Sequence, residues 1–125
     1  MRYDASFQPP APVLDIVIRN PYARDGAYTC RAMLDTGASI SVIPQEAMAA
    51  LKIVEAQKVL ARSWDGSSRE VVTCIARLEF DGGIIPLVEV VVADRPTALL
   101  GRDVLNLLRL LLDGPALTLD ILPPV

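Results

Sequence analysis

The sequence predicts an all-β domain, in the form of a closed barrel or a folded sheet, with only two short helices. Apolar and polar residues alternate with a period of two along most of the chain, and clusters of Gly, Pro, Asn and Asp separate these runs. The chain has 125 residues, of which 52% are hydrophobic, and this is enough for one core without disulfides or metal. We therefore expect one domain over residues 13–125, preceded by an extended, proline-containing N-terminal arm at residues 1–12.

The first predicted element is a β-hairpin that ends at Asp35. Residues 13–19 alternate between apolar and polar, and residues 20–26 contain the turn formers Asn, Pro, Asp and Gly. Residues 27–34 form the returning strand. The hairpin therefore delivers an acidic residue at the end of an apolar strand.

A short strand and a short helix follow. Residues 40–43 are strand-like, and Pro44 opens a helix over residues 45–51, because proline is favoured in a first turn and alanine and leucine are good helix formers. This helix is too short to be stable without tertiary packing.

The middle of the chain predicts a second hairpin. Residues 53–61 and 69–80 are strands, and the segment 62–68 between them contains Asp-Gly and serines, which favour a turn. Trp64 lies in this segment and has two interpretations, a core tryptophan or a residue at the turn. Its position beside Asp-Gly-Ser-Ser favours the turn.

The rest of the chain continues the β pattern. Residues 81–83 form a turn, and residues 84–93 are apolar on both faces except for Glu89, which is typical of a central strand. The remaining predicted elements are a strand end at Leu99-Leu100-Gly101, a short helix over residues 102–108, and a hairpin of residues 109–112 and 116–122, in which Leu117, Leu119 and Ile121 face one way and which Pro123 and Pro124 end.

Composition excludes several classes of function. The net charge of −3 and the lack of a basic block do not indicate binding to nucleic acid. The chain has no histidine, which excludes Ser-His and Cys-His nucleophiles and histidine-based zinc sites, so carboxylates are the most credible catalytic groups. Cys30 and Cys74 have no metal-like spacing and lie on apolar strand faces, so we expect buried free thiols, no disulfide and no cofactor.

Hydropathy and the N-terminus bear on location. No stretch approaches the roughly 20 apolar residues that a membrane-spanning helix requires. The N-terminus lacks the positive start and apolar run of a secretory signal. We expect a soluble, cytoplasmic protein that does not bind membranes.

Asp35 is followed by Thr36, Gly37 and Ala38, between two apolar runs. A carboxylate in such a place is costly to desolvate unless hydrogen bonds or a function compensate. Glycine permits close approach of another backbone or a substrate, and the threonine hydroxyl can donate and accept hydrogen bonds. The alternative interpretation is an ordinary hairpin tip with an Asx-type turn.

A second stretch, Ala98-Leu99-Leu100-Gly101-Arg102-Asp103, has a similar pattern. The end of an apolar strand is followed by a glycine and then by polar residues that begin a predicted helix. Together, the two motifs and their spacing resemble the retropepsin-like aspartic proteases, which include the retroviral proteases and their cellular relatives. The resemblance extends from about residue 13 to residue 121. It implies a retropepsin-like fold with one Asp-Thr-Gly half-site per chain.

The resemblance also implies roles for individual residues. Asp35 would be the catalytic carboxyl, Thr36 would bond across a dimer axis, Gly37 and Ala38 would present backbone to substrate, and Gly101 would pack beneath their loop. The residues around Trp64, Asp65, Gly66 and Ser67 would form the tip of a flap over bound peptide. Arg102 matches an arginine that pairs in viral members with an acid four residues after the catalytic aspartate, where this chain has Ser39. The C-terminal hairpin is also longer than the viral terminal strand, so we do not transfer the viral dimer interface.

Three hypotheses remain open from the sequence. Metal-free peptide hydrolysis needs two carboxyls that share a proton, so a chain with one Asp-Thr-Gly would act as a homodimer. The first hypothesis is therefore a homodimeric aspartic endopeptidase, with itself and a peptide or protein substrate as partners. The second is a catalytically silent binding or dimerisation module of the same fold, and the third is a generic small β-barrel with fortuitous motifs. If a single chain could hydrolyse peptides alone, it would need a second catalytic acid, and Asp103 would be the first residue to test for this role.

Overall fold

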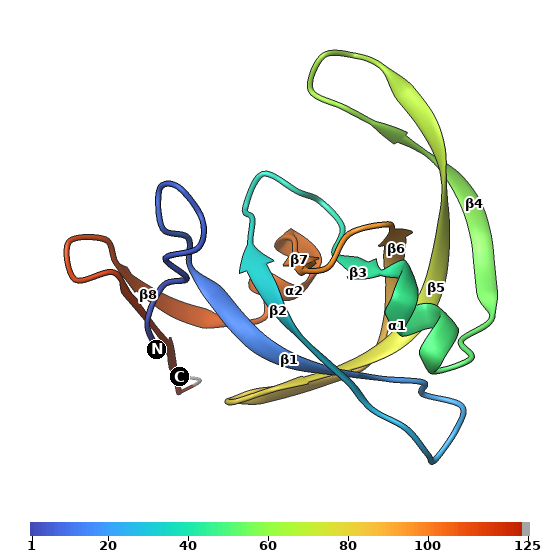
Figure 1. The fold of residues 1–125 in the computed structure, drawn as a ribbon, viewed down its shortest axis with the longest axis horizontal. Coiled ribbons are helices and arrows are strands. Elements are labelled where there is room, and N and C mark those ends of the chain that lie inside the picture. The colour runs from blue at the N-terminus through green and yellow to red at the C-terminus, as the bar shows by residue number, and fades with distance from the viewer. Residues whose placement is uncertain (124–125) are drawn as a thin grey trace.

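The computed structural model describes residues 1–123. Pro124, which the sequence predicts to end the last hairpin together with Pro123, lies outside this range. The described elements follow each other as shown in Figure 1: β1 (Val13–Arg19), β2 (Tyr28–Leu34), β3 (Val42–Pro44), α1 (Gln45–Ala50), β4 (Glu55–Arg62), β5 (Ser68–Phe80), β6 (Gly83–Ala93), β7 (Ala98–Leu100), α2 (Arg102–Leu105), β8 (Arg109–Asp113) and β9 (Thr118–Leu122). The predicted all-β class with two short helices is confirmed.

Six strands form a closed barrel. The order in the sheet is β1-β2-β7-β3-β6-β5, and an antiparallel pairing of β1 with β5 closes it, while β4 extends the sheet outside the barrel on β5. β6 lies between β3 and β5, so the predicted central strand is confirmed. Closure pairs β1 with β5, so β4 is the edge strand of this seven-stranded sheet.

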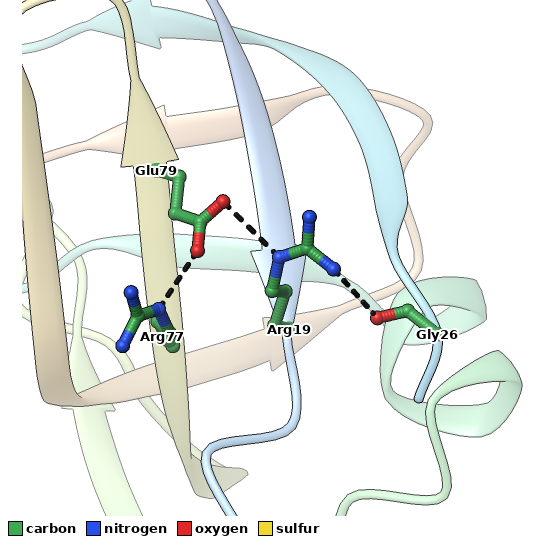
Figure 2. Close-up of polar contacts among 4 residues, drawn as sticks. All are labelled: Arg19, Gly26, Arg77 and Glu79. Carbon is green, nitrogen blue, oxygen red and sulfur yellow. Dashed lines mark hydrogen bonds and ion pairs between the residues drawn. The ribbon is translucent and has the colours of Figure 1, made fainter. Parts of the chain in front are cut away.

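A cluster of charged side chains marks the closure of the barrel (Figure 2). The Glu79 carboxylate on β5 accepts hydrogen bonds from Arg77 Nε at 2.8 Å and from Arg19 Nε on β1 at 3.1 Å. Arg19 also donates to the Gly26 carbonyl in the β1–β2 loop. The two arginines, Arg77 first, lower the pKa of Glu79. The Arg19–Glu79 ion pair thus joins the first strand to the strand that closes the barrel, whereas Arg77 and Glu79 both lie on β5.

The core is the barrel interior. Alternate residues of β1 and β5 point into it, as the period of two predicted, and the largest fully buried side chains include Leu14, Ile16, Ile18 and Leu78. Both cysteines are free, as expected, but only Cys74 is buried. Burial raises the pKa of Cys74 to about 11. Cys30 is half-buried, because it lies near the solvent-exposed part of β2, where exposed and half-buried residues alternate.

Three local predictions are corrected by the structure. The strand predicted at residues 40–43 begins only at Val42, because Ser41 is drawn into side-chain hydrogen bonds. The helix predicted at residues 102–108 ends at Leu105 and continues in turns with shorter-range bonds, such as Leu108 N–H to the Leu105 carbonyl. Leu117 does not share the face of Leu119 and Ile121, because it adopts a left-handed conformation (φ 54°) in the turn before β9.

The N-terminal arm packs against the C-terminal hairpin of the same chain. Arg2 pairs with Thr118, and Tyr3 N–H donates to the Leu117 carbonyl at 2.8 Å. The buried Asp4 accepts hydrogen bonds from Ser6 and, at 2.6 Å, from Arg31 on β2. The arm therefore ties the β8–β9 hairpin to the barrel, with the N-terminus beside the C-terminal hairpin in Figure 1.

Candidate active site

Asp35 lies directly after β2, at the start of the loop that leads to β3 (Figure 1). β2 runs parallel to β7, and the Asp35 N–H continues their ladder by donating to the Leu100 carbonyl at 2.9 Å. The carboxylate is half-buried, and its Oδ1 accepts the Gly37 N–H at 2.8 Å. Its Oδ2 has no hydrogen-bond partner among residues 1–123. One carboxylate oxygen is thus held by the loop, and the other remains available.

Gly101 supports this loop from below. A Cβ at position 101 would lie 2.9 Å from the Ala38 carbonyl oxygen and 3.0 Å from the backbone of Ile40, so no larger residue fits without displacement of the loop. Gly37 is less restricted, since its nearest contact would be Asp35 Oδ1 at 3.1 Å. The two predicted motifs therefore meet in space, with Gly101 beneath the Asp35 loop.

Arg102 clamps the same loop. Its Nη1 donates to the Thr36 carbonyl at 2.7 Å, and its backbone N–H donates to the Ala38 carbonyl at 2.8 Å. Among residues 1–123, Arg102 forms no ion pair with a carboxylate, in keeping with Ser39 at the position of the viral acid. The guanidinium instead holds the loop through a backbone carbonyl.

A buried hydrogen-bond network that sequence reasoning missed lies behind the loop. The fully buried Ser41 donates its hydroxyl to Asp103 Oδ1 at 2.7 Å and its N–H to Asp103 Oδ2 at 3.0 Å. Ser41 Oγ accepts the Gly101 N–H at 3.0 Å, and Asp103 Oδ1 also accepts the N–H of Val104. The available signal was a serine within the apolar run 40–43, but nothing in the sequence joined it to Asp103. Both Asp103 carboxylate oxygens accept hydrogen bonds, so this side chain stabilises the backbone behind the loop.

The tip of the β4–β5 hairpin carries the other predicted site residues, Trp64, Asp65, Gly66 and Ser67. The Trp64 side chain is 100% exposed, which excludes the interpretation as a core tryptophan. Ser67 donates from its N–H and hydroxyl to Asp65 Oδ1, which lowers the pKa of Asp65, and Gly66 adopts φ +87°. Figure 1 shows this hairpin rising beyond the barrel, on the same upper side of the view as the loop that follows β2. No hydrogen bond joins the tip to the Asp35 loop within the described residues.

The arrangement is suited to acid-base chemistry. The described residues hold no cluster of His, Cys, Asp or Glu side chains that could bind a metal ion. They also contain no helix long and apolar enough to cross a membrane. A pocket of about 400 Å³ lies between α1, β5 and β6, with Met48, Val72 and Val92 in its lining, and Asp35 does not line it. Asp35 instead lies outside this pocket, with one carboxylate oxygen bonded to the Gly37 N–H.

Comparisons with known proteins agree with this geometry. A family model described as aspartyl protease matches residues 21–104, which include the Asp35 loop, the β4–β5 hairpin and Gly101. Among solved structures, the chain is similar to the EIAV protease, a retroviral enzyme, in complex with the inhibitor HBY-793, with a TM-score of 0.57, 25% sequence identity, and coverage of 77% of this chain and 86% of that chain. No curated protein matches the chain. The retropepsin-like fold predicted from the motifs is confirmed.

Proposed function

This chain belongs to the retropepsin-like aspartic protease family, and on that premise we propose that it is a homodimeric aspartic endopeptidase in which Asp35 of each chain supplies half of the active site. The observation that carries the proposal is the half-buried Asp35 carboxylate, with one oxygen bonded to Gly37 N–H and the other without a partner among residues 1–123. A single carboxylate is not enough for metal-free peptide hydrolysis, which needs both a base and an acid.

The second acid is best supplied by a second copy of the chain. The first candidate for a second acid within the chain, Asp103, has both oxygens bonded to Ser41 and Val104. A two-fold axis beside Asp35 places two equivalent carboxyls in contact, since an isologous contact brings the same residue from both chains to the axis. The pair would share one proton, because two carboxylates in contact cannot both ionise at low cost.

The chemistry then follows from the shared proton. The ionised Asp35 takes a proton from a water molecule, which attacks the carbonyl carbon of the scissile peptide bond. The protonated Asp35 of the other chain donates its proton to the carbonyl oxygen, which gives a gem-diol. As the C–N bond breaks, the first Asp35 passes the proton that it took from water to the leaving amine, and the other Asp35 takes a proton back from a hydroxyl of the diol, which restores the starting pair. The loop contacts made by Gly101 and Arg102 support this step, because they fix the backbone on which Asp35 is carried.

The substrate is an extended peptide segment. Thr36 would bond across the axis, and Gly37 and Ala38 would present backbone groups to the peptide. Trp64, Asp65, Gly66 and Ser67, at the end of the β4–β5 hairpin, would cover the peptide as a flap. The exposed Trp64 supports this role, because a fully solvated indole gains from covering an apolar side chain of a substrate.

The absent acidic partner of Arg102 is the one observation that favours the alternative, a silent binding or dimerisation module. Its weight is reduced by the direct bond from Arg102 to the Thr36 carbonyl, which replaces the missing support. A scaffold without activity also has no need for a carboxylate with an unpaired oxygen in this loop.

The test is hydrolysis of a diverse peptide library by the wild type and by Asp35→Asn. We expect cleavage at weakly acidic pH by the wild type only, with equal thermal unfolding for both proteins. Asp25→Asn, at an exposed carboxylate of the β1–β2 loop, is the matched control and should retain activity. A transition-state analogue with a tetrahedral hydroxyl should inhibit the wild type. Turnover that survives in purified Asp35→Asn would exclude the proposal, and a wild type that neither cleaves nor binds the analogue would favour the silent module.

A further inference from the structure

Part of β5 has no neighbouring strand on the side of β6. β5 pairs with β4 from Ser68 onward, but its pairing with β6 begins only at Val72. β6 ends at Ala93, and the chain then turns away from β5, with the Arg95 N–H donating to the Ala93 carbonyl at 3.0 Å. Figure 1 shows β5 continuing past the end of β6 into the β4–β5 hairpin. Among residues 1–123, no strand therefore pairs with residues 68–71 on this side.

The pocket of about 400 Å³ between α1, β5 and β6 lies at this unpaired edge, and we name it the β5-edge pocket. Four consecutive residues of β5, from Arg69 to Val72, line it, together with the end of β6 and with Gln45 and Met48 of α1. Consecutive side chains of a strand point to opposite faces of the sheet. A cavity lined by four in a row therefore lies along the edge of the strand, where an added strand would lie.

The lining of the β5-edge pocket combines an apolar wall with an acidic rim. The wall is formed by valines of β5 and β6 and by Met48, and Glu55, Glu70 and Asp94 are exposed on the rim. Within residues 1–123, none of these three carboxylates forms an ion pair. Arg69 is the one basic residue in the lining, so negative charge is in excess. This lining is complementary to a long side chain with an apolar stem and a positive head, as in lysine and arginine.

We propose that the β5-edge pocket is a second peptide-binding site, in which an extended segment with one lysine or arginine adds to β5 as a strand in line with β6. The segment gains main-chain hydrogen bonds from the unpaired edge, and its basic side chain lies along the apolar wall with its head at the rim. The segment belongs to the protein substrate but lies outside the stretch that is cleaved, since Asp35 does not line the pocket. This assignment to the substrate rests on the proposed function.

One substrate can reach both sites. In the sheet order β2-β7-β3-β6, three strand spacings separate β2, which leads to Asp35, from β6. At roughly 4.8 Å per spacing, the separation across the sheet is about 14 Å. A flexible linker of about ten residues has a root-mean-square length of roughly 17 Å. Such a linker between the cleaved stretch and the basic segment would raise the effective concentration of the substrate at Asp35.

Binding is measured first on Asp35→Asn, which should leave peptides intact. The probe is a capped hexapeptide, Thr-Val-Lys-Val-Thr-Ser, titrated while the backbone amide signals of residues 68–72 are followed by NMR. We expect these signals to shift, and replacement of the lysine by norleucine should raise Kd roughly fivefold. Methylation of alternate peptide nitrogens tests strand pairing, because only one of the two alternate sets faces β5. One methylated set should abolish binding, and the other should bind like the parent peptide.

Neutral variants of the rim test the charge complementarity. Glu70→Gln combined with Asp94→Asn should raise the Kd of the lysine peptide roughly fivefold and leave that of the norleucine peptide unchanged. Asp25→Asn combined with Asp81→Asn makes the same change of net charge at exposed carboxylates outside the pocket and should bind like the parent protein. Thermal unfolding of each variant shows that the chain is folded.

A linked substrate tests the assignment to the substrate. In it, a linker of about ten residues joins the lysine segment to a peptide that the wild type cleaves. The linked substrate should have a severalfold higher kcat/KM than the cleaved peptide alone. Glu70→Gln with Asp94→Asn should remove this advantage and leave cleavage of the short peptide unchanged.

The binding experiments can overturn the inference in several ways. Absence of binding, equal effects of the two methylated sets, or a Kd that does not depend on the rim charges would each contradict strand addition at the pocket. Binding of N-acetyl-lysine methylamide as tight as that of the hexapeptide would assign the pocket to a small cation instead. Sedimentation that shows weaker self-association of the rim variant would assign it to a second copy of the chain.

The cleavage experiments separate this inference from the proposed function. A linked substrate without advantage, beside normal cleavage of the short peptide, overturns the assignment to the substrate and leaves the protease proposal intact. A wild type that cleaves no peptide overturns the protease proposal alone, because binding to Asp35→Asn decides the peptide site without any turnover.

Discussion

The Asp35 loop and the tip of the β4–β5 hairpin are both short turns that contain Asp and Gly, but they are held in different ways. The Asp35 loop is fixed by residues far away in the chain, through Leu100, Gly101 and Arg102. Among the bonds of residues 1–123, those at the hairpin tip are all local, such as Ser63 N–H to the Ser67 carbonyl at 2.8 Å and Ser67 N–H to Asp65 Oδ1.

The Asp35 loop is therefore expected to be rigid, and the hairpin tip to move. A loop fixed by long-range contacts keeps a catalytic group in one position, as acid-base chemistry demands. A turn with local bonds keeps its shape while the hairpin bends as a whole, as a flap over substrate requires. Substitutions at the Asp35 loop should therefore reduce stability and activity together, whereas substitutions at the tip should reduce activity alone.

The largest effect is expected for Gly101→Ala. The new Cβ would lie 2.9 Å from the Ala38 carbonyl oxygen, and overpacking of this kind costs about 1–3 kcal/mol. Since the loop carries Asp35, hydrolysis should fall by at least tenfold as well. Denaturant unfolding and peptide hydrolysis measure the two effects. Gly114→Ala, where a Cβ meets nothing within 4 Å, is the control. Equal stability and equal activity of the two variants would show that Gly101 does not support the Asp35 loop.

Ser41→Ala should also destabilise the Asp35 loop, because Ser41 lies behind it. The substitution leaves the Gly101 N–H without its acceptor and removes a donor to Asp103, and an unsatisfied buried group costs about 1–3 kcal/mol. Urea unfolding should show the loss. Ser39→Ala, at an exposed position of the same loop, should have little effect. A stable Ser41→Ala protein would indicate that the network contributes little.

The two motifs could be predicted from the sequence, but the hydrogen bonds that hold the Asp35 loop in place could not. Asp35, Gly37 and Gly101 were found because turn chemistry and apolar flanks are local signals. The Ser41–Asp103 bonds join residues 62 positions apart, and a single sequence carries no signal for such a pair. For the same reason Arg102 was left without a partner, since its partner is the backbone carbonyl of Thr36, and backbone acceptors are not encoded by residue type.

Element types were predicted better than element ends. The period of two in residues 13–19 and 69–80 determines which residues enter the barrel, because one face of each strand must be buried. Proline content alone could not predict where the arm packs, since its contacts with Leu117 and Leu119 depend on the path of the whole chain.

Trp64→Ala tests the role of the tip of the β4–β5 hairpin in substrate binding. The exposed indole makes no packing contribution, so unfolding should change by less than about 0.5 kcal/mol. Loss of flap contact with the peptide should raise KM several-fold, and Trp64→Phe should restore most of the affinity. Steady-state kinetics beside thermal unfolding separate the two effects. A clear loss of stability would mean that the tip packs against other parts of the molecule.

The smallest effect concerns the N-terminal arm at low pH. Hydrogen bonds from Ser6 and then from Arg31 lower the pKa of Asp4 from 3.8 to about 2. Because the folded-state pKa lies below the unfolded value, this stabilisation is present above about pH 4 and is lost as the pH falls towards 2. The protection factor of the Tyr3 amide, which is bonded to the Leu117 carbonyl, should therefore fall over this range, measured as the exchange rate relative to the intrinsic rate at each pH. Asp4→Asn should remove the pH dependence of this protection factor, and an unchanged profile in that variant would assign the effect to another group.

The most direct test of the shared active site is a mixture of wild type with Asp35→Asn. If each chain holds half of the site, the mutant traps wild-type chains in inactive heterodimers, and activity per wild-type chain should fall to about half at equal amounts and further with excess mutant. Dilution of the wild type alone should lower specific activity as dimers dissociate. Activity that is independent of added mutant and constant on dilution would contradict the shared site.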